Sequence, residues 1–312
     1  MLSAISQHLQ EKFKVFFLTD NILLNNKIIP IVQENFQELK NSGEGKTIAF
    51  IDGGQAEILS GGNVCLSFIR VFSQVMKSTA KVSGQKNEFY LLTTAIYKNG
   101  DIWYESKLFP TAGESLIDEN DLLICSNDLA IRSGNERGPI ARVAGIARRL
   151  AELHLASRAQ ADFVLLDGTL TPSFEVENKY LSNKASALTK TCALFTTSGN
   201  HPAVLLQKLS PFAGCWSYAV DGKTFFVKLH PRAEHIFRFE GNPNLLPVLV
   251  SQCGDALFVG YPYGLILADK LARVSNEEKR SLRMNFLLRP ENTLLRSYLN
   301  TMNAHEILDG MG

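Results

Sequence analysis

The sequence has few cysteines, no long apolar run and almost no net charge. Its five cysteines, Cys65, Cys125, Cys192, Cys215 and Cys253, are widely separated and form no C-x-x-C pair. This spacing argues against a disulfide framework or a zinc ribbon and is typical of a reducing compartment. No apolar run reaches the ~20 residues that cross a bilayer, and the N-terminus lacks a signal-peptide pattern. We therefore expect a cytoplasmic protein without a membrane partner.

The charges nearly cancel, with 32 basic and 31 acidic side chains in 312 residues. A net charge of +1 gives no global field that attracts nucleic acid, so such a partner would have to be met by a local patch. Hydrophobic residues make up 45% of the chain, and glycine and proline number 22 and 11. This composition excludes wholesale disorder and fibrous folds and provides for a sizeable core.

The first 46 residues differ in pattern from the rest. Their apolar positions predict helices that pack on a core formed later in the chain. These positions are Ile5, Leu9, Phe13, Ile22, Ile29, Val32 and Phe36. We therefore expect residues 1–46 to form an N-terminal helical segment and residues 47–312 to form one continuous domain.

From Thr47 the pattern becomes strand-like. The run TIAFIDGG is mostly apolar and ends in Gly-Gly, which predicts a central strand with a tight exit and Asp52 at its carboxyl end. β-Branched and aromatic runs follow in NVCLSFIRVF and EFYLLTTAIY, and Asn99-Gly100 is a hairpin turn signal. These segments predict an antiparallel meander of three strands.

Helices and further strands are expected after this meander. Pro139 begins an apolar repeat at helical spacing, and DFVLLDGTL then predicts a second buried strand that ends at Asp167. A helix is expected at about 177–187, a hairpin at Asp221-Gly222, and helices from about Leu265 to the end. This order indicates an α/β fold.

The two predicted strands that end in Asp-Gly are candidates for a functional site. Ligands of open α/β sheets bind in the crevice beyond the carboxyl ends of the strands. Asp52 and Asp167 on neighbouring strands would repel each other unless a cation lay between them, and Mg²⁺ and Mn²⁺ favour such oxygen ligands. The pattern predicts a metal-dependent phosphodiesterase. The alternative is that Asp-Gly marks only a turn, as expected at Asp221.

Four segments together resemble the NurA nuclease family of DNA-end-processing enzymes. They are IDGG, the arginine-rich helix feeding LLDGTL, FFVKLHPRAEHIFRFE and GYPYGLILADKLARVS, and the resemblance runs from about Thr47 to the C-terminal AHEILDG. It implies an RNase H-like mixed sheet with three antiparallel strands, flanking helices and hairpin elaborations. It also implies Mn²⁺-dependent 5′-to-3′ exonuclease and single-strand endonuclease activity, a homodimer, and a HerA-type hexameric translocase as partner.

The resemblance extends to five candidate catalytic residues. Asp52 and Asp167 match the two strand acids of the family, and Glu152 is the best match for its helix glutamate. Asp269 stands where the family often carries histidine, which keeps the donor set all-oxygen, and Lys190 resembles a lysine that follows the second acidic strand. The four acids are the expected ligands of two Mn²⁺ or Mg²⁺ ions. Ordinary ion pairs are the alternative: Glu152 with Arg148 or Arg149, and Asp269 with Arg273.

Candidate DNA contacts lie in two further segments. Six arginines but only two acids occur between Arg132 and Arg158, and we expect Arg142, Arg148 and Arg149 to bind phosphates. Tyr261 and Tyr263 in GYPYG are candidates for stacking on unpaired bases. The alternatives are a solvated helix face for the arginines and buried packing for the tyrosines.

Two other functions share the predicted core. An actin-like ATPase also uses strand-end aspartates, but its phosphate hairpins have a D-x-G pattern that neither Asp-Gly here matches, and the chain has no Walker loop. A non-catalytic NurA-like module that binds DNA or a helicase is the third possibility, which the Asp269 departure keeps open.

Overall fold

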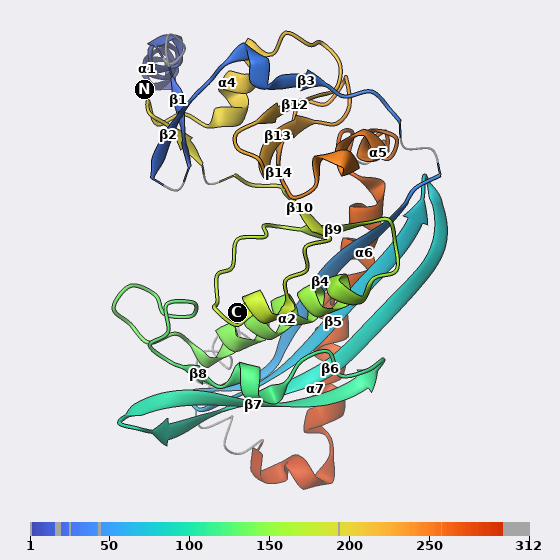
Figure 1. Ribbon diagram of the computed structural model, residues 1–312. Coiled ribbons are helices and arrows are strands. Elements are labelled where there is room, and N and C mark those ends of the chain that lie inside the picture. Colours follow the sequence, from blue (N-terminus) through green and yellow to red (C-terminus); the bar gives the residue numbers. More distant parts are fainter. Residues whose placement is uncertain are drawn as a thin grey trace.

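The computed structural model describes most of the chain (Figure 1). The described residues are 2–15, 20–24, 26–42, 45–192, 194–256 and 258–295, and of residues 12–15 only the backbone is described. The C-terminal AHEILDG stretch of the family resemblance lies outside them.

The centre of the molecule is a mixed sheet of RNase H-like topology. Three long strands, β4 (Thr47–Gly61), β5 (Val64–Lys77) and β6 (Ala80–Lys98), form the expected antiparallel meander. On its other edge β4 pairs in parallel with β9 (Phe163–Asp167), which pairs in parallel with β10 (Ala185–Thr189). The resulting order β6-β5-β4-β9-β10 is the RNase H-like arrangement, so the predicted fold class is confirmed.

Further strands extend this core to eleven strands within the described residues. Beyond β6 lie β7 (Asp101–Ala112) and β8 (Ile124–Cys125), and the Asn99-Gly100 turn has the predicted left-handed backbone, with φ of 53° and 83°. Beyond β10 the order continues with three antiparallel strands that include the predicted hairpin at Asp221, and then β3. These strands are β14 (Phe237–Glu240), β13 (Thr224–Lys228), β12 (Trp216–Ala219) and β3 (Phe36–Glu38).

Helices cover both faces of the central strands (Figure 1). On one face α2 (Val143–Arg158) buries an apolar stripe against β4, β5 and β9. On the other face α6 (Tyr263–Ala272) packs so closely that a Cβ on Gly264 would lie 2.1 Å from the ring of Phe50. Four further helices complete the described part of the chain after α2: α3 (Glu177–Tyr180), α4 (Pro202–Leu209), α5 (Leu246–Val250) and α7 (Asn276–Leu287).

The prediction of an N-terminal helical segment is wrong beyond α1 (Leu2–Val15). Short strands follow instead: β1 (Asn21–Leu24) and β2 (Lys27–Pro30) make a small sheet with β11 (Phe195–Thr196), and β3 joins the main sheet after a 3-10 turn at Gln33–Asn35. The apolar residues in this stretch fit alternation within short strands as well as helical spacing, and pairing with β11 and β12 decided between them.

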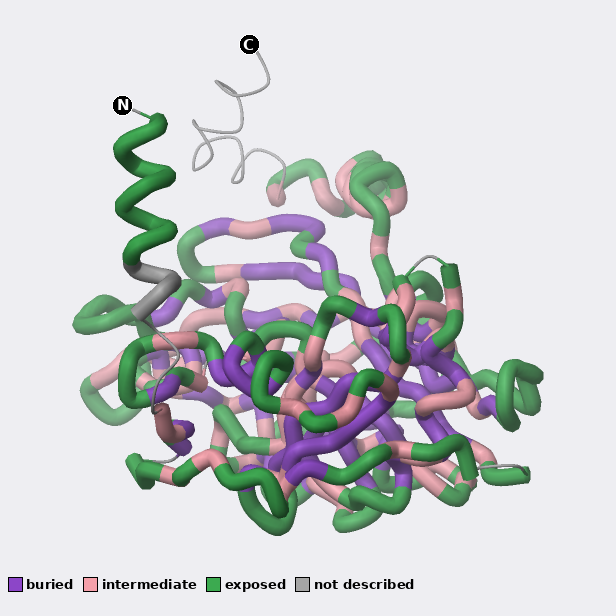
Figure 2. Tube along the Cα trace, turned by 90° about the horizontal axis from the view of Figure 1, so that it is seen from above, coloured by how far each residue is buried: buried purple, intermediate pink, exposed green. Residues whose placement is uncertain are grey.

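The helix α1 also differs from its expected role of packing on the core. Its residues from Leu2 to Glu11 are all exposed (Figure 2), with Ile5 and Leu9 about half exposed. The apolar stripe of α1 therefore marks an amphipathic helix and not a buried one.

The prediction of a helix at about 177–187 is also wrong. Only α3 is helical, and residues 185–189 form β10. The run ASALT is short and apolar, so its periodicity does not distinguish a buried strand from a helix. Parallel pairing with β9 makes it the fifth strand of the core.

The strand that carries Asp52 does not end at Gly-Gly as predicted. Instead β4 continues to Gly61, because its two glycines provide space for neighbours and not a turn. A Cβ on Gly53 would lie 2.5 Å from Oε1 of Glu152, and one on Gly54 would lie 2.2 Å from the carbonyl oxygen of Ala272. The two glycines thus let α2 and α6 approach the same point of β4.

No helix in the described ranges is long and apolar enough to cross a membrane.

Candidate active site

Asp52 and Asp167 lie level with each other on adjacent strands. The parallel pairing of β4 with β9 aligns Ile51 with Leu166, so the next residue on each strand is an aspartate. Side chains alternate along a strand, so both aspartates share a face with Phe50 and Leu165, which belong to the core under α6. The two strands are neighbours, as expected, but only β9 ends at this level of the sheet.

Asp52 is a buried carboxylate without a cationic partner. Its side chain is 8% exposed and accepts a hydrogen bond from its neighbour Gly53 (N to Oδ1, 2.8 Å), and the described part of the chain offers it no ion pair. Burial, and then the negative charges of Glu152 and Asp167, raise its pKa from 3.8 to about 7. Burial and the neighbouring carboxylates thus disfavour the ionised form of Asp52.

Glu152 comes to the site from α2 and is 3% exposed. Burial raises the pKa of its carboxyl group, and two arginines counteract this effect. Arg148 lies 3.0 Å from Oε1 and Arg149 lies 3.6 Å from Oε2. The ion pairs considered from the sequence are therefore present, but they are buried at the site and do not lie on a solvated helix face.

Lys190 lies against Asp167, with 2.5 Å between Nζ and Oδ2, and its side chain is about half exposed. Burial alone would lower the pKa of this lysine, but the bond to Asp167 and the charges of Asp52 and Asp269 raise it. The expected position of Lys190 beside the acidic strand ends is confirmed.

Asp269 reaches the same region from α6. Its charge contributes to the raised pKa of Asp52, although its oxygen pairs with Arg273 at 2.6 Å. The ordinary ion pair with Arg273, one helical turn along, is therefore present, and the role of Asp269 as a metal ligand stays a prediction.

The helix arginines separate into two groups. Arg148 donates to the carbonyl of Gly53 at 2.8 Å, and Arg149 donates to the carbonyl of Thr169 in the loop after β9. With Asp52, Glu152 and Asp167, these two arginines line a cavity of 430 Å³. Arg142 instead donates to the carbonyls of Ile131 and Arg132 and does not line this cavity. Its guanidinium thus holds the loop before α2, and its DNA contact stays a prediction.

The two tyrosines expected to stack on bases do not present free faces to the site. Tyr261 is 3% exposed and packs against Phe237 and Phe258, with ring centroids 5.3 and 5.7 Å apart. Tyr263 opens α6 and lines a different hollow with Gln252. Buried packing, the alternative considered from the sequence, describes Tyr261.

Two buried carboxylates that the sequence analysis missed shape the site. Glu177 accepts hydrogen bonds from the backbone of Ser173 and Phe174 and lies 3.5 Å from Arg149. Glu240 accepts from the hydroxyl of Thr169 at 2.9 Å, also in the loop after β9. No local sequence signal marked Glu177, which follows Ser173 by four residues and not by the three of a capping box. The contact of Glu240 depends on the β10–β14 pairing, which the sequence did not predict.

The donor set suits a hard divalent cation, since all four predicted ligands are carboxylates. The side chains are not gathered around one point, however: within the described residues, no three Asp, Glu, His or Cys groups could hold one ion. Ion pairs explain this, because Glu152, Asp167 and Asp269 each bind an arginine or lysine. A metal cation would have to compete with these ion pairs. Of the four predicted ligands, Asp52 is the one without an ion-pair partner among the described residues.

No protein-family model matches the sequence, and no curated protein matches it. Fourteen chains of solved structures match, including the following two. The NurA nuclease from Sulfolobus solfataricus is 11% identical, with 81% of this chain and 86% of that chain covered and a TM-score of 0.46. The catalytic domain of human endonuclease V is 11% identical, with 92% of this chain and 98% of that chain covered and a TM-score of 0.35. The likeness is one of fold.

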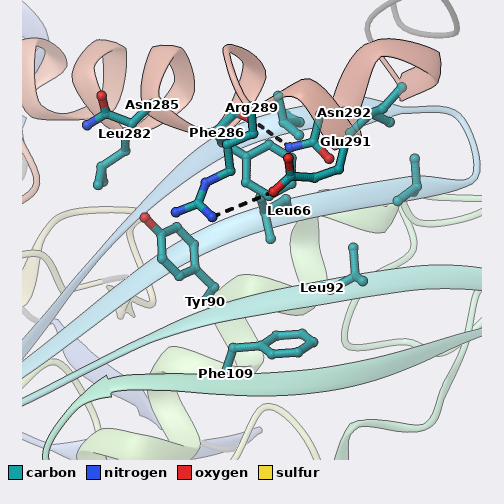
Figure 3. A pocket seen from close by; sticks show the side chains of 13 residues that line it. Leu66, Tyr90, Leu92, Phe109, Leu282, Asn285, Phe286, Arg289, Glu291 and Asn292 are labelled. Atoms are coloured by element: carbon teal, nitrogen blue, oxygen red, sulfur yellow. Dashed lines mark hydrogen bonds and ion pairs between the residues drawn. The ribbon is translucent and has the colours of Figure 1, made fainter.

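An apolar groove of 440 Å³ lies elsewhere, between the outer strands and α7 (Figure 3). Leu66, Leu92, Phe109 and Phe286 are among its lining residues. Its charged side chains form a loose pair, Arg289 with Glu291 at 3.9 Å, and both are two-thirds exposed. This groove offers apolar contact, whereas the acidic cavity concentrates charge.

Proposed function

We propose that this protein is a divalent-metal-dependent deoxyribonuclease whose active site is the acidic cavity. The observation that carries the proposal is Asp52, a buried carboxylate that faces Glu152, Asp167 and Asp269 and has no cation of its own among the described residues. Strongly perturbed ionisable groups in a cavity are typical of functional sites. An RNase H-like sheet with acids on the adjacent β4 and β9 strands supports phosphodiester hydrolysis as the chemistry.

Asp52, Glu152, Asp167 and Asp269 would hold the metal, as two Mn²⁺ or Mg²⁺ ions. Bound ions would supply a water of lowered pKa and neutralise charge on the leaving oxygen. Lys190, half exposed beside Asp167, is placed to hold a phosphate oxygen of the strand as a point charge.

The two arginines of α2 would act as positioning residues. Arg148 ties α2 to the carbonyl of Gly53, and Arg149 ties it to the loop after β9. Their guanidinium groups thereby fix Glu152 relative to both strands that carry the aspartates. Because each guanidinium keeps several donors, the same side chains can also face an incoming phosphate.

The finer activity follows the sequence resemblance. We propose 5′-to-3′ exonuclease and single-strand endonuclease activity in DNA end resection and repair, with a HerA-type translocase as partner, in a cytoplasmic homodimer. These proposals depend on the motifs quoted for the family and add a substrate and partners to the chemistry of the site.

The test is degradation of linear single-stranded DNA with Mn²⁺. Asp52→Asn and Asp167→Asn should each lower the rate by about 10³-fold or more, because each removes a charge that would bind the ion. Glu291→Gln, the same change in the apolar groove, is the matched control and should cleave like the wild type. Chelation of the metal should abolish cleavage by every variant that still cleaves DNA.

Two results would contradict the proposal. Wild-type protein that releases no more nucleotides than Asp52→Asn, alone and with a translocase, while still binding DNA would identify a non-catalytic binding module. Hydrolysis of ATP by the purified protein, lost in Asp52→Asn, would identify the actin-like ATPase.

A further inference from the structure

An exposed pair of stacked rings lies close to the acidic cavity. Phe258 is 40% exposed although it is large and apolar, and His235 is also exposed. Their ring centroids are 5.1 Å apart and their planes differ by 22°, so the rings stack on each other and each keeps one face that the other does not cover. A flat aromatic surface in water offers a partner for another flat ring.

The pair rests on a buried aromatic base. Phe258 contacts Phe237 and Tyr261, at centroid distances of 6.2 and 5.7 Å, and both of these rings are 3% exposed. Gly260, with φ of 96°, lets the loop that carries Phe258 close against the loop before β14, since a Cβ there would lie 2.5 Å from Cβ of Ala233. The surface is therefore supported from below by packed side chains.

This surface is continuous with the site. Tyr261, beneath Phe258, has Nζ of Lys190 over its ring at 5.2 Å, and the same Nζ lies 2.5 Å from Asp167. One buried ring thus connects Phe258 to the lysine and the acidic strand end.

We propose that Phe258 and His235 form a stacking shelf for an unpaired nucleobase of the DNA strand that lies in the acidic cavity. This inference rests on the proposed function. Every base has an aromatic face, so stacking tolerates any sequence, and it requires an unpaired base because the faces in a duplex are already covered. The shelf would hold the strand in place beside Lys190 and select single-stranded substrate.

The test measures binding without cleavage, by fluorescence anisotropy of a labelled oligo-dT strand in chelator. Phe258→Ala should weaken binding by about 5- to 150-fold, the change that one stacked base contributes. Phe258→Trp should restore binding. Tyr97→Ala, which removes another exposed ring (76% exposed), is the matched control and should bind like the wild type.

A strand with abasic sites separates stacking from other effects. The wild type should bind it more weakly than oligo-dT by the same factor, and Phe258→Ala should bind both strands equally. Equal binding of oligo-dT by Phe258→Ala and the wild type would overturn the shelf, as would no preference of the wild type for bases. The proposed function fails separately, if Asp52→Asn cleaves like the wild type.

Discussion

Two hollows on the same long strands differ in almost everything except size. The acidic cavity at Asp52 and the apolar groove at Leu59 have volumes of 430 and 440 Å³ and lie seven residues apart along β4, about 20 Å at the usual rise per residue. The cavity is lined by carboxylates and guanidiniums, the groove by leucine and phenylalanine side chains.

This difference shows that the volume of a hollow is a poor guide to function here. The groove is a hollow between apolar side chains, and the ion pair of Arg289 with Glu291 there is long and exposed. In the cavity, burial and neighbouring charges raise the pKa of Asp52. The chemistry of a site lies where burial and like charge act on the same group.

The largest effect expected to sharpen this contrast is the dependence of the free energy of unfolding on pH. The pKa of Asp52 rises from 3.8 to about 7 on folding, so the folded state binds the extra proton between these values and wild-type stability falls as pH rises through that window. Without added metal, Asp52→Asn should match the wild type near pH 4 and exceed it above pH 7 by up to about 4 kcal/mol. Urea denaturation at several pH values measures this. Glu291→Gln is the control, and a pH-independent gain in Asp52→Asn would contradict the expectation.

A smaller effect is expected from the close approach of α6. Gly54→Ala places a Cβ 2.2 Å from the backbone oxygen of Ala272, so β4 and α6 must separate, and we expect destabilisation of about 2 to 3 kcal/mol. Gly214→Ala, where a Cβ meets nothing within 4 Å, is the control. Chemical denaturation compares the two. If both variants lose the same stability, the close approach at Gly54 is not a constraint.

The smallest effect concerns the exposed ion pair of Asp269. Arg273 is 68% exposed, so Arg273→Gln should change the free energy of unfolding by less than about 1 kcal/mol. Because the substitution frees Asp269, Mn²⁺ should bind about two- to threefold more tightly, as measured by calorimetry. Unchanged or weaker Mn²⁺ binding would show that Asp269 does not contribute to the ion site.

The sequence predicted the parts of the fold whose pattern is local. The long meander from Thr47 and the hairpins at Asn99 and Asp221 follow from alternation and turn residues, and the structure has them. The strands β1, β3 and β10 were missed because each is at most five residues long and owes its form to pairing with a distant segment. Length and remote partners are not visible in local periodicity.

The acidic residues of the site could be predicted from the sequence, but the residues around them could not. Asp52 and Asp167 each follow a buried run, so their position at one level of the sheet could be expected. The burial of Tyr261 and the exposure of Phe258 could not be expected. Both residues lie in one short loop, and contacts with β14 and α6 determine which side chain is buried. Aromatic side chains in a loop show no periodicity from which to read a buried face.

The contact between Gly53 and Glu152 restricts how this protein can change over generations. With 2.5 Å between a Cβ at 53 and Oε1 of Glu152, any side chain added at 53 requires the carboxylate to retreat, together with the arginines that hold it. A side chain at 53 therefore requires a change or a shift at 152. A lineage that gains alanine at 53 should carry a shorter acid at 152, and laboratory evolution from Gly53→Ala should recover Glu152→Asp first.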